Sequence, residues 1–340
     1  MAIDSLVNDE MSKNWDKSDY ELWGNSLMSD LSFWIDNAKK YPTIYNISTL
    51  GIINMDDHRK YKVTIGITAN VDSVNNAIIA IYSIIAVYDR TKNCIRFENI
   101  TNEIIKDWYS VKIGNVIFYK EKEKQFNRTE ADWSNHFSDS MAAFFKLKPI
   151  QNIVFFSSKN SYQVYQLKGI DYIGNMFFAG TGGFAIRGGK NSRFDHIIFS
   201  GNNMEKYDHE FVHLYTDLLI RDRNSSTAFA DEGIATFLGG SDGHSLSYHL
   251  TALKDHLHKD SSLTFDKLFS NNAYKIDGNV KSTYSVGGLF AKLIYTKRNV
   301  DGLITFLNAS QMNLKKVTAD LLGVNENELA ILFYEELEKY

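Results

Sequence analysis

The period of the hydrophobic pattern changes near residue 203, and this change limits the folds that the 340-residue chain can adopt. Between about residues 60 and 120, short β-branched and aromatic runs alternate with turn residues, which favours strands. The pattern is then mixed: we expect a helix from residue 127 to 145, a short helical piece that ends at residue 167, and strands at residues 150–157, 184–187 and 194–200. Beyond residue 203 apolar residues recur at helical spacing almost throughout. Strands followed by helices predict an α+β protein with a β-rich N-terminal region and a helical C-terminal part.

Two segments before residue 90 differ from this pattern. The first forty residues have apolar side chains at roughly helical spacing, among them Leu22, Leu27 and Leu31, and Pro42 then ends the segment. We therefore expect an N-terminal helix. The apolar run from Ala77 to Tyr88 fits a buried strand pair or a helix, and its periodicity alone does not decide between them.

Composition and charge exclude several classes of protein. The formal net charge of −4 argues against a nucleic-acid partner, because such proteins normally carry a basic domain or stripe. No apolar run approaches the roughly 18–20 residues of a membrane helix, so we expect no transmembrane segment. A single cysteine excludes an intrachain disulfide framework. The mixed charges of residues 120–124 predict a solvated loop.

A five-residue motif, His209-Glu210-Phe211-Val212-His213, lies in the first helical segment after residue 203. On a helix, positions i and i+4 share a face, so both imidazoles can bind one tetrahedral zinc ion. Glu210 lies one position further round the helix, where it can act as the general base that takes a proton from water. The alternative is a surface helix with incidental His and Glu residues.

Glu232 supplies a candidate third ligand, because it follows His213 after eighteen intervening residues. The polar segment 221–226 allows a second helix to return antiparallel and to present Glu232 to the same metal ion. The small residues Gly233 and Ala235 favour close helix packing. Two histidines and one carboxylate leave a fourth position open, which is typical of catalytic zinc sites. We therefore expect one Zn²⁺ per chain.

The motif, together with Asp231-Glu232-Gly233-Ile234-Ala235, resembles the gluzincin metallopeptidases, in particular the peptidase-MA-like group related to M1 aminopeptidases. The resemblance implies a thermolysin-like zincin catalytic domain at residues 113–340 that hydrolyses a peptide or protein substrate. Residues 1–112 would then form an N-terminal helix plus a β-rich region of unknown role. The family usually has Asn at the position of Asp231, whose carboxylate could instead accept a hydrogen bond from His213 and fix its tautomer.

The same resemblance assigns a catalytic role to Tyr284. M1-like enzymes carry a tyrosine three residues before a glycine at the start of a helix, and its phenol stabilises the oxyanion; Tyr284 and Gly287 fit this pattern. The alternative is a packing tyrosine in a chain that has nineteen.

One element of that family is missing. The strand expected near residues 182–187 lacks the glutamate with which M1 aminopeptidases hold the free amino terminus. An endopeptidase is therefore favoured over an aminopeptidase, and a carboxypeptidase stays open if Arg187 binds a terminal carboxylate. Gly183, Phe184 and Ala185 are candidate substrate-binding residues, since this strand could pair with an extended substrate.

Other interpretations stay open at this point. A catalytically inactive zincin-fold scaffold is the main alternative to an enzyme, and zinc-dependent hydrolysis of a non-peptide amide is another. A second metal site could be drawn from four histidines, although their polar context favours solvated side chains: His244, His249, His256 and His258. The oligomeric state is left open, and an extracytoplasmic location after loss of a leader is slightly favoured over the cytoplasm.

Overall fold

Contacts within the chain divide it into two compact units, one of residues 1–127 and 152–205 and the other of residues 128–151 and 206–340. The division predicted between residues 112 and 113 lies inside the first unit and stays a prediction. The computed structural model describes residues 29–56, 59–70, 76–89, 94–174, 181–187, 196–222, 226–260, 262–270, 274–277 and 280–340. The predicted α+β class, with a β-rich N-terminal region and a helical C-terminal part, is confirmed.

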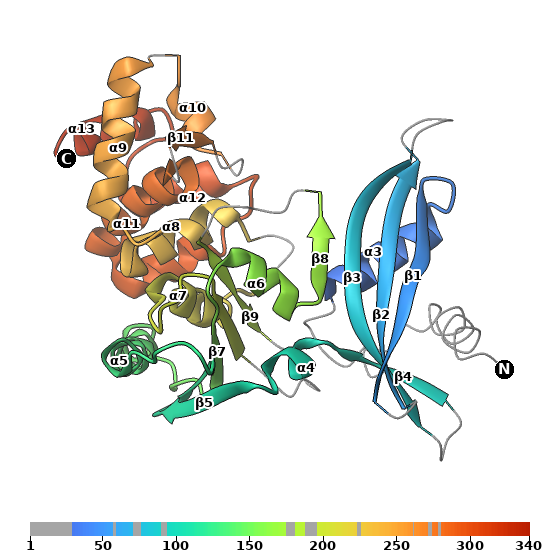
Figure 1. Ribbon diagram of the computed structural model, residues 1–340. Helices are drawn as coiled ribbons and strands as arrows, with labels where there is room; N and C mark the ends of the chain where they lie inside the picture. The colour runs from blue at the N-terminus through green and yellow to red at the C-terminus, as the bar shows by residue number, and fades with distance from the viewer. Residues whose placement is uncertain are drawn as a thin grey trace. The chain divides into compact units, whose positions relative to one another are not determined.

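The described part of the first unit starts with helix α3 (Ser29–Lys40), which an antiparallel sheet follows (Figure 1). The predicted N-terminal helix corresponds to α3 from Ser29 onward, whereas Leu22 and Leu27 lie outside the described residues. The run that the sequence left open between strand and helix is part of β3. The strand order is β1-β2-β3-β4, and β8 also pairs with β3; the strands are β1 (Tyr45–Asp56), β2 (Lys60–Asn70), β3 (Asn76–Asp89), β4 (Cys94–Asn99) and β8 (Ile170–Ile173).

Alternating burial along β2 explains how this sheet is held. Its odd-numbered residues from Tyr61 to Ile67 are buried, as one face of a strand requires. They belong to a core cluster that also contains Leu31 and Ile35 of α3, so the helix covers this face of the sheet.

A second sheet in the same unit has mixed topology, in the order β5-β6-β7-β10-β9. The inner strands β6, β7 and β10 are parallel, and the edge strands β5 and β9 are antiparallel to their neighbours. Helices α4 (Thr101–Ile105) and α6 (Ser161–Leu167) contribute to the core on one face. The strands are β5 (Trp108–Ile113), β6 (Val116–Glu121), β7 (Ile153–Ser157), β9 (Gly183–Arg187) and β10 (His196–Ser200).

A buried ion pair joins distant parts of the first unit. Lys120 Nζ lies 2.5 Å from Glu205 Oε1, and the two side chains are 3% and 0% exposed. The other carboxylate oxygen of Glu205 accepts a hydrogen bond of 2.9 Å from the backbone N–H of Asn127. The expectation of a solvated loop at residues 120–124 is therefore wrong for Lys120, because β6 continues through it.

We expect Lys120→Met to lower the free energy of unfolding by about 3–5 kcal/mol, because it leaves the Glu205 carboxylate buried without its cation. Urea denaturation measures the change. Lys122→Met, which removes the same charge from an exposed position nearby, should change the free energy by less than about 0.5 kcal/mol. Equal effects of the two substitutions would contradict a stabilising role for the buried pair.

The second unit is almost wholly helical, as the sequence predicts beyond residue 203, and a small hairpin is the exception (Figure 1). The hairpin consists of β11 (Lys275–Asp277) and β12 (Val280–Lys281). The helices are α5 (Arg128–Phe144), α7 (Asp208–Thr216), α8 (Ala228–Gly239), α9 (Leu246–Lys259), α10 (Phe265–Leu268), α11 (Ser282–Leu307), α12 (Leu314–Leu322) and α13 (Leu329–Leu337).

Two contacts place the helices that matter for the site. A Cβ atom at Gly233 of α8 would overlap the backbone of Gly287 in α11, so glycine allows these helices to touch backbone to backbone. The buried hydroxyl of Tyr215 in α7 lies 3.0 Å from Ser138 Oγ of α5 and accepts a hydrogen bond of 3.2 Å from the N–H of Ile150. These contacts join α8 to α11 and α7 to α5.

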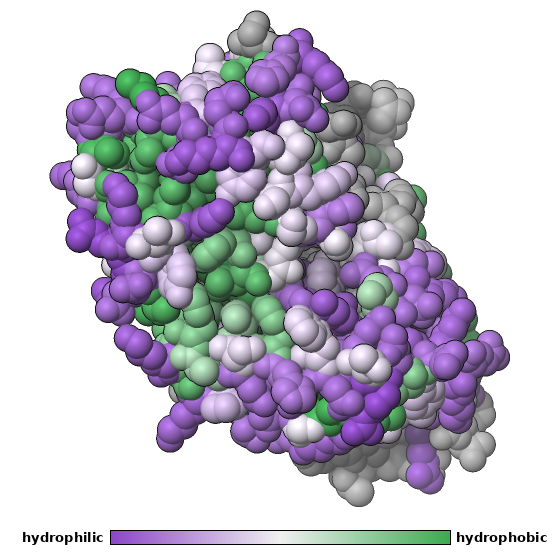
Figure 2. Space-filling view, turned by 90° about the vertical axis from the view of Figure 1, so that its left-hand side faces the viewer, coloured by the Kyte–Doolittle hydropathy of each residue, from purple (hydrophilic) through white to green (hydrophobic). Residues whose placement is uncertain are grey.

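In Figure 2 hydrophobic side chains gather in a band bordered by hydrophilic ones on the face turned to the viewer. None of the described helices combines the length and the hydrophobicity that crossing a membrane requires.

Candidate metal centre

Helix α7 presents two histidines on one face. His209 and His213 lie one turn apart, and their ring centroids are 4.7 Å from each other. The helix is held firmly, because Phe211, Val212 and Tyr215 are fully buried. His209 and Glu210 are also buried, whereas the side chain of His213 is 16% exposed.

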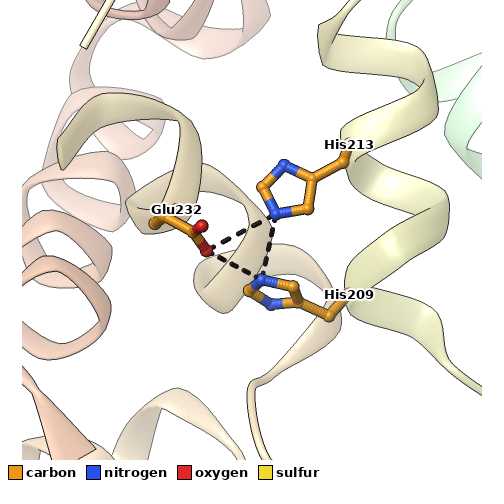
Figure 3. Close-up of side chains that lie close together, drawn as sticks. All are labelled: His209, His213 and Glu232. Carbon is orange, nitrogen blue, oxygen red and sulfur yellow. Dashed lines mark hydrogen bonds and ion pairs between the residues drawn. The ribbon is translucent and has the colours of Figure 1, made fainter. Parts of the chain in front are cut away.

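Helix α8 brings Glu232 to these rings (Figure 3). Its start is defined by Thr227, whose side chain accepts a hydrogen bond from the N–H of Ala230. Glu232 Oε2 lies 3.0 Å from His209 Nε2 and 3.4 Å from His213 Nε2, and the two Nε2 atoms are 3.1 Å apart. Two imidazole nitrogens and one carboxylate oxygen thus converge within 4.8 Å, which fits the ligand set of a zinc ion.

The outer nitrogen of each ring is held by an acceptor. His213 Nδ1 lies 3.0 Å from Asp231 Oδ2, the pair of residues that the sequence suggested, and Thr216 Oγ1 donates to Asp231 Oδ1 at 2.7 Å. His209 Nδ1 lies 2.6 Å from the carbonyl oxygen of Gly240, which can only accept a hydrogen bond. Both acceptors therefore favour a proton on Nδ1, and the Nε2 atom of each ring faces the common point.

The two histidines keep the Glu232 carboxylate ionised, as an anionic ligand must be. Burial alone would raise the pKa of the Glu232 carboxyl, but the charges and hydrogen bonds of His213 and His209 outweigh it and lower that pKa. Burial opposes protonation of His213, yet the carboxylates of Asp231 and Glu232 raise its pKa well above the usual value. A cation that binds here therefore displaces a proton from the His213 ring.

Tyr284 lies in the first turn of α11, close to the candidate metal ligands. Its ring centroid is 5.8 Å from that of His209, and Lys281 Nζ donates to its hydroxyl at 3.3 Å. Burial, followed by the charge of Glu232, raises the pKa of the Tyr284 phenol, so it stays protonated and can donate a hydrogen bond. Burial and the charge of Glu210 likewise raise the pKa of the phenol of Tyr207, the residue directly before α7.

The candidate substrate strand belongs to the first unit. Gly183, Phe184 and Ala185 lie in β9, where Phe184 is paired with Phe199 of β10. This strand ends the order of its sheet and has no second partner strand among the described residues. The assignment of these three residues to substrate binding stays a prediction.

The four histidines considered for a second metal site differ in burial. His244 is exposed and stacks on Tyr248 with ring centroids 3.8 Å apart, and the His258 side chain is 61% exposed. His249 is fully buried, so the expectation of a solvated side chain is wrong for it. Within the described part of the chain, His209, His213 and Glu232 form the only group of three residues that could hold a metal ion.

No protein-family model matches the chain. A search of curated proteins also finds no match.

We expect Asp231→Asn to weaken zinc binding by about 10–100-fold, because the substitution removes the charged acceptor that orients His213. Competition with a chelator measures the affinity. Asp255→Asn makes the same charge change at an exposed position of α9 and should leave the affinity unchanged. A wild-type affinity in Asp231→Asn would show that the contact does not tune the site.

Proposed function

We propose that the chain is a zinc-dependent peptidase of the gluzincin type, with the thermolysin-like catalytic arrangement that the sequence motifs suggest. His209, His213 and Glu232 would hold one zinc ion. The observation that carries this proposal is the convergence of their three ligand atoms from two helices, with the far side of each imidazole already held by an acceptor. Incidental surface histidines would not be buried and oriented in this way.

The chemistry follows from which groups surround the common point. A zinc ion bound by two imidazoles and a carboxylate keeps an open position and lowers the pKa of water toward neutrality. Glu210, buried and one residue after His209, takes the proton from the attacking water and passes it to the leaving amine, so that a peptide and water give a carboxylate and an amine. Tyr284 donates a hydrogen bond to the oxyanion that develops on the carbonyl.

An endopeptidase is favoured over an aminopeptidase. Residues 182–187 contain no acidic side chain that could hold a free amino terminus, and β9 has the edge position from which a strand can pair with an extended peptide. Arg187, the last residue of β9, would favour a carboxypeptidase if it binds a terminal carboxylate. Assays with internally quenched peptides and with peptides of free carboxyl terminus separate these two specificities.

Protein purified without chelator is expected to contain about one zinc per chain, and His213→Ala should lose it, because two ligands do not hold the ion firmly. Elemental mass spectrometry measures the content. His258→Ala removes an exposed histidine from α9 and should keep the metal. Protein that stays zinc-free after incubation with zinc would exclude the peptidase and favour a zincin-fold scaffold without turnover.

Glu210→Gln should retain zinc and lower the rate of peptide hydrolysis by at least about 10²–10⁴-fold, because the amide cannot accept the proton of the attacking water. Chelator-sensitive cleavage of a mixed peptide library, read by mass spectrometry, gives the activity. Glu326→Gln, at an exposed position, is the matched control and should cleave like the wild type. Undiminished cleavage by Glu210→Gln would overturn the mechanism.

A further inference from the structure

His249 is a buried histidine that the proposed mechanism does not use. It lies on α9 with no exposed surface, and its ring centroid is 6.0 Å from that of Tyr284. Its Nε2 lies 3.0 Å from the carbonyl oxygen of Ser241, to which it can only donate. Burial lowers the pKa of His249, so the ring is neutral and carries its proton on Nε2.

The acceptor of this hydrogen bond belongs to a short segment that also holds a candidate ligand. The carbonyl of Gly240 accepts from His209 Nδ1 at 2.6 Å. Gly240 has a φ of 73°, a conformation that L side chains rarely adopt, and the backbone of Ser241 pairs with that of His244 in both directions. The backbone of residues 240–241 therefore links the His249 side chain to the orientation of the His209 ring.

The environment of His249 indicates that its Nε2–H is the reason for a histidine at this position. Its Nδ1 atom is buried and has no hydrogen-bond partner among the described residues. A buried nitrogen without a partner is unfavourable, and an apolar side chain in the same space would avoid it. The compensating feature is the hydrogen bond to Ser241, which an apolar side chain cannot make.

We propose that His249 is a positioning residue of the metal centre: through the Ser241 carbonyl it fixes the backbone of residues 240–241, whose Gly240 carbonyl orients His209. The inference rests on the metal-binding part of the proposed function and does not require peptide hydrolysis. A shift of this backbone would turn the His209 ring away from the other two ligand atoms.

Zinc affinity of the full-length chain, measured by chelator competition, tests the proposal with three variants. His249→Phe removes the donor and keeps an aromatic ring, and it should weaken zinc binding by about 10-fold or more. His249→Gln keeps an N–H donor at similar reach and should restore most of the affinity. Leu253→Ala, at a fully buried position of the same helix, should lower the melting temperature and leave the zinc affinity unchanged.

A second measurement uses zinc-free protein and is independent of any metal or activity. The Nδ1–H proton of His209, hydrogen-bonded to the Gly240 carbonyl, should give a protected downfield NMR signal, assigned by its loss in His209→Gln. The signal should shift or broaden in His249→Phe and stay in place in Leu253→Ala.

The outcomes distinguish the proposed peptidase function from the positioning role of His249. Wild-type protein that binds zinc but cleaves no peptide would end the proposed function and leave this inference standing on the affinity series. An unchanged His209 signal and an unchanged zinc affinity in His249→Phe would overturn the inference. Equal losses of affinity in His249→Phe and Leu253→Ala would also overturn it, because general destabilisation would then explain both.

Discussion

The backbone contact between α8 and α11 is the constraint on which the candidate metal centre depends. Because Gly233 and Gly287 have no side chains, the two helices approach more closely than any other residue pair would allow. Glu232 precedes the first glycine by one residue, and Tyr284 precedes the second by three. Close packing therefore places a candidate ligand and a phenol beside the histidines of α7, so that the site is a product of helix packing as well as of its motif.

Much of the fold could be predicted because most segments have an unambiguous period. The alternation at residues 61–67 and the helical spacing beyond residue 203 each allow one type of structure only. The type of structure at residues 77–88 does not follow from the period, because β3 is buried without a break from Tyr82 to Ala86 and lacks alternation there. The burial of Lys120 does not follow from the local sequence either, because its partner Glu205 is 85 residues away and no local pattern reveals such a pair.

Part of the candidate site could also be predicted from the sequence, and part could not. His209, His213 and Glu232 were predictable because the sequence shows both the types of the ligand residues and their spacing, and the structure brings the three side chains together. Asp231 was predictable from its place beside Glu232. The Gly240 carbonyl could not be predicted, because any residue can supply a carbonyl. His249 could not be predicted either, because the local sequence does not show which of the four histidines is buried. The groups that orient the candidate ligands come close to them only in the folded chain, so their positions in the sequence do not identify them.

The discontinuous units have a consequence for the order of events during synthesis. Helix α5 ends at Phe144 but packs with α7, which is complete only at Thr216. At a translation rate of roughly 5–20 residues per second, α5 leaves the ribosome several seconds before its partner helix exists. During that interval the side chains of Ala131, Met141 and Ala142, buried in the folded protein, have no cover from the second unit. The apolar face of α5 is therefore without its packing partner for several seconds during synthesis.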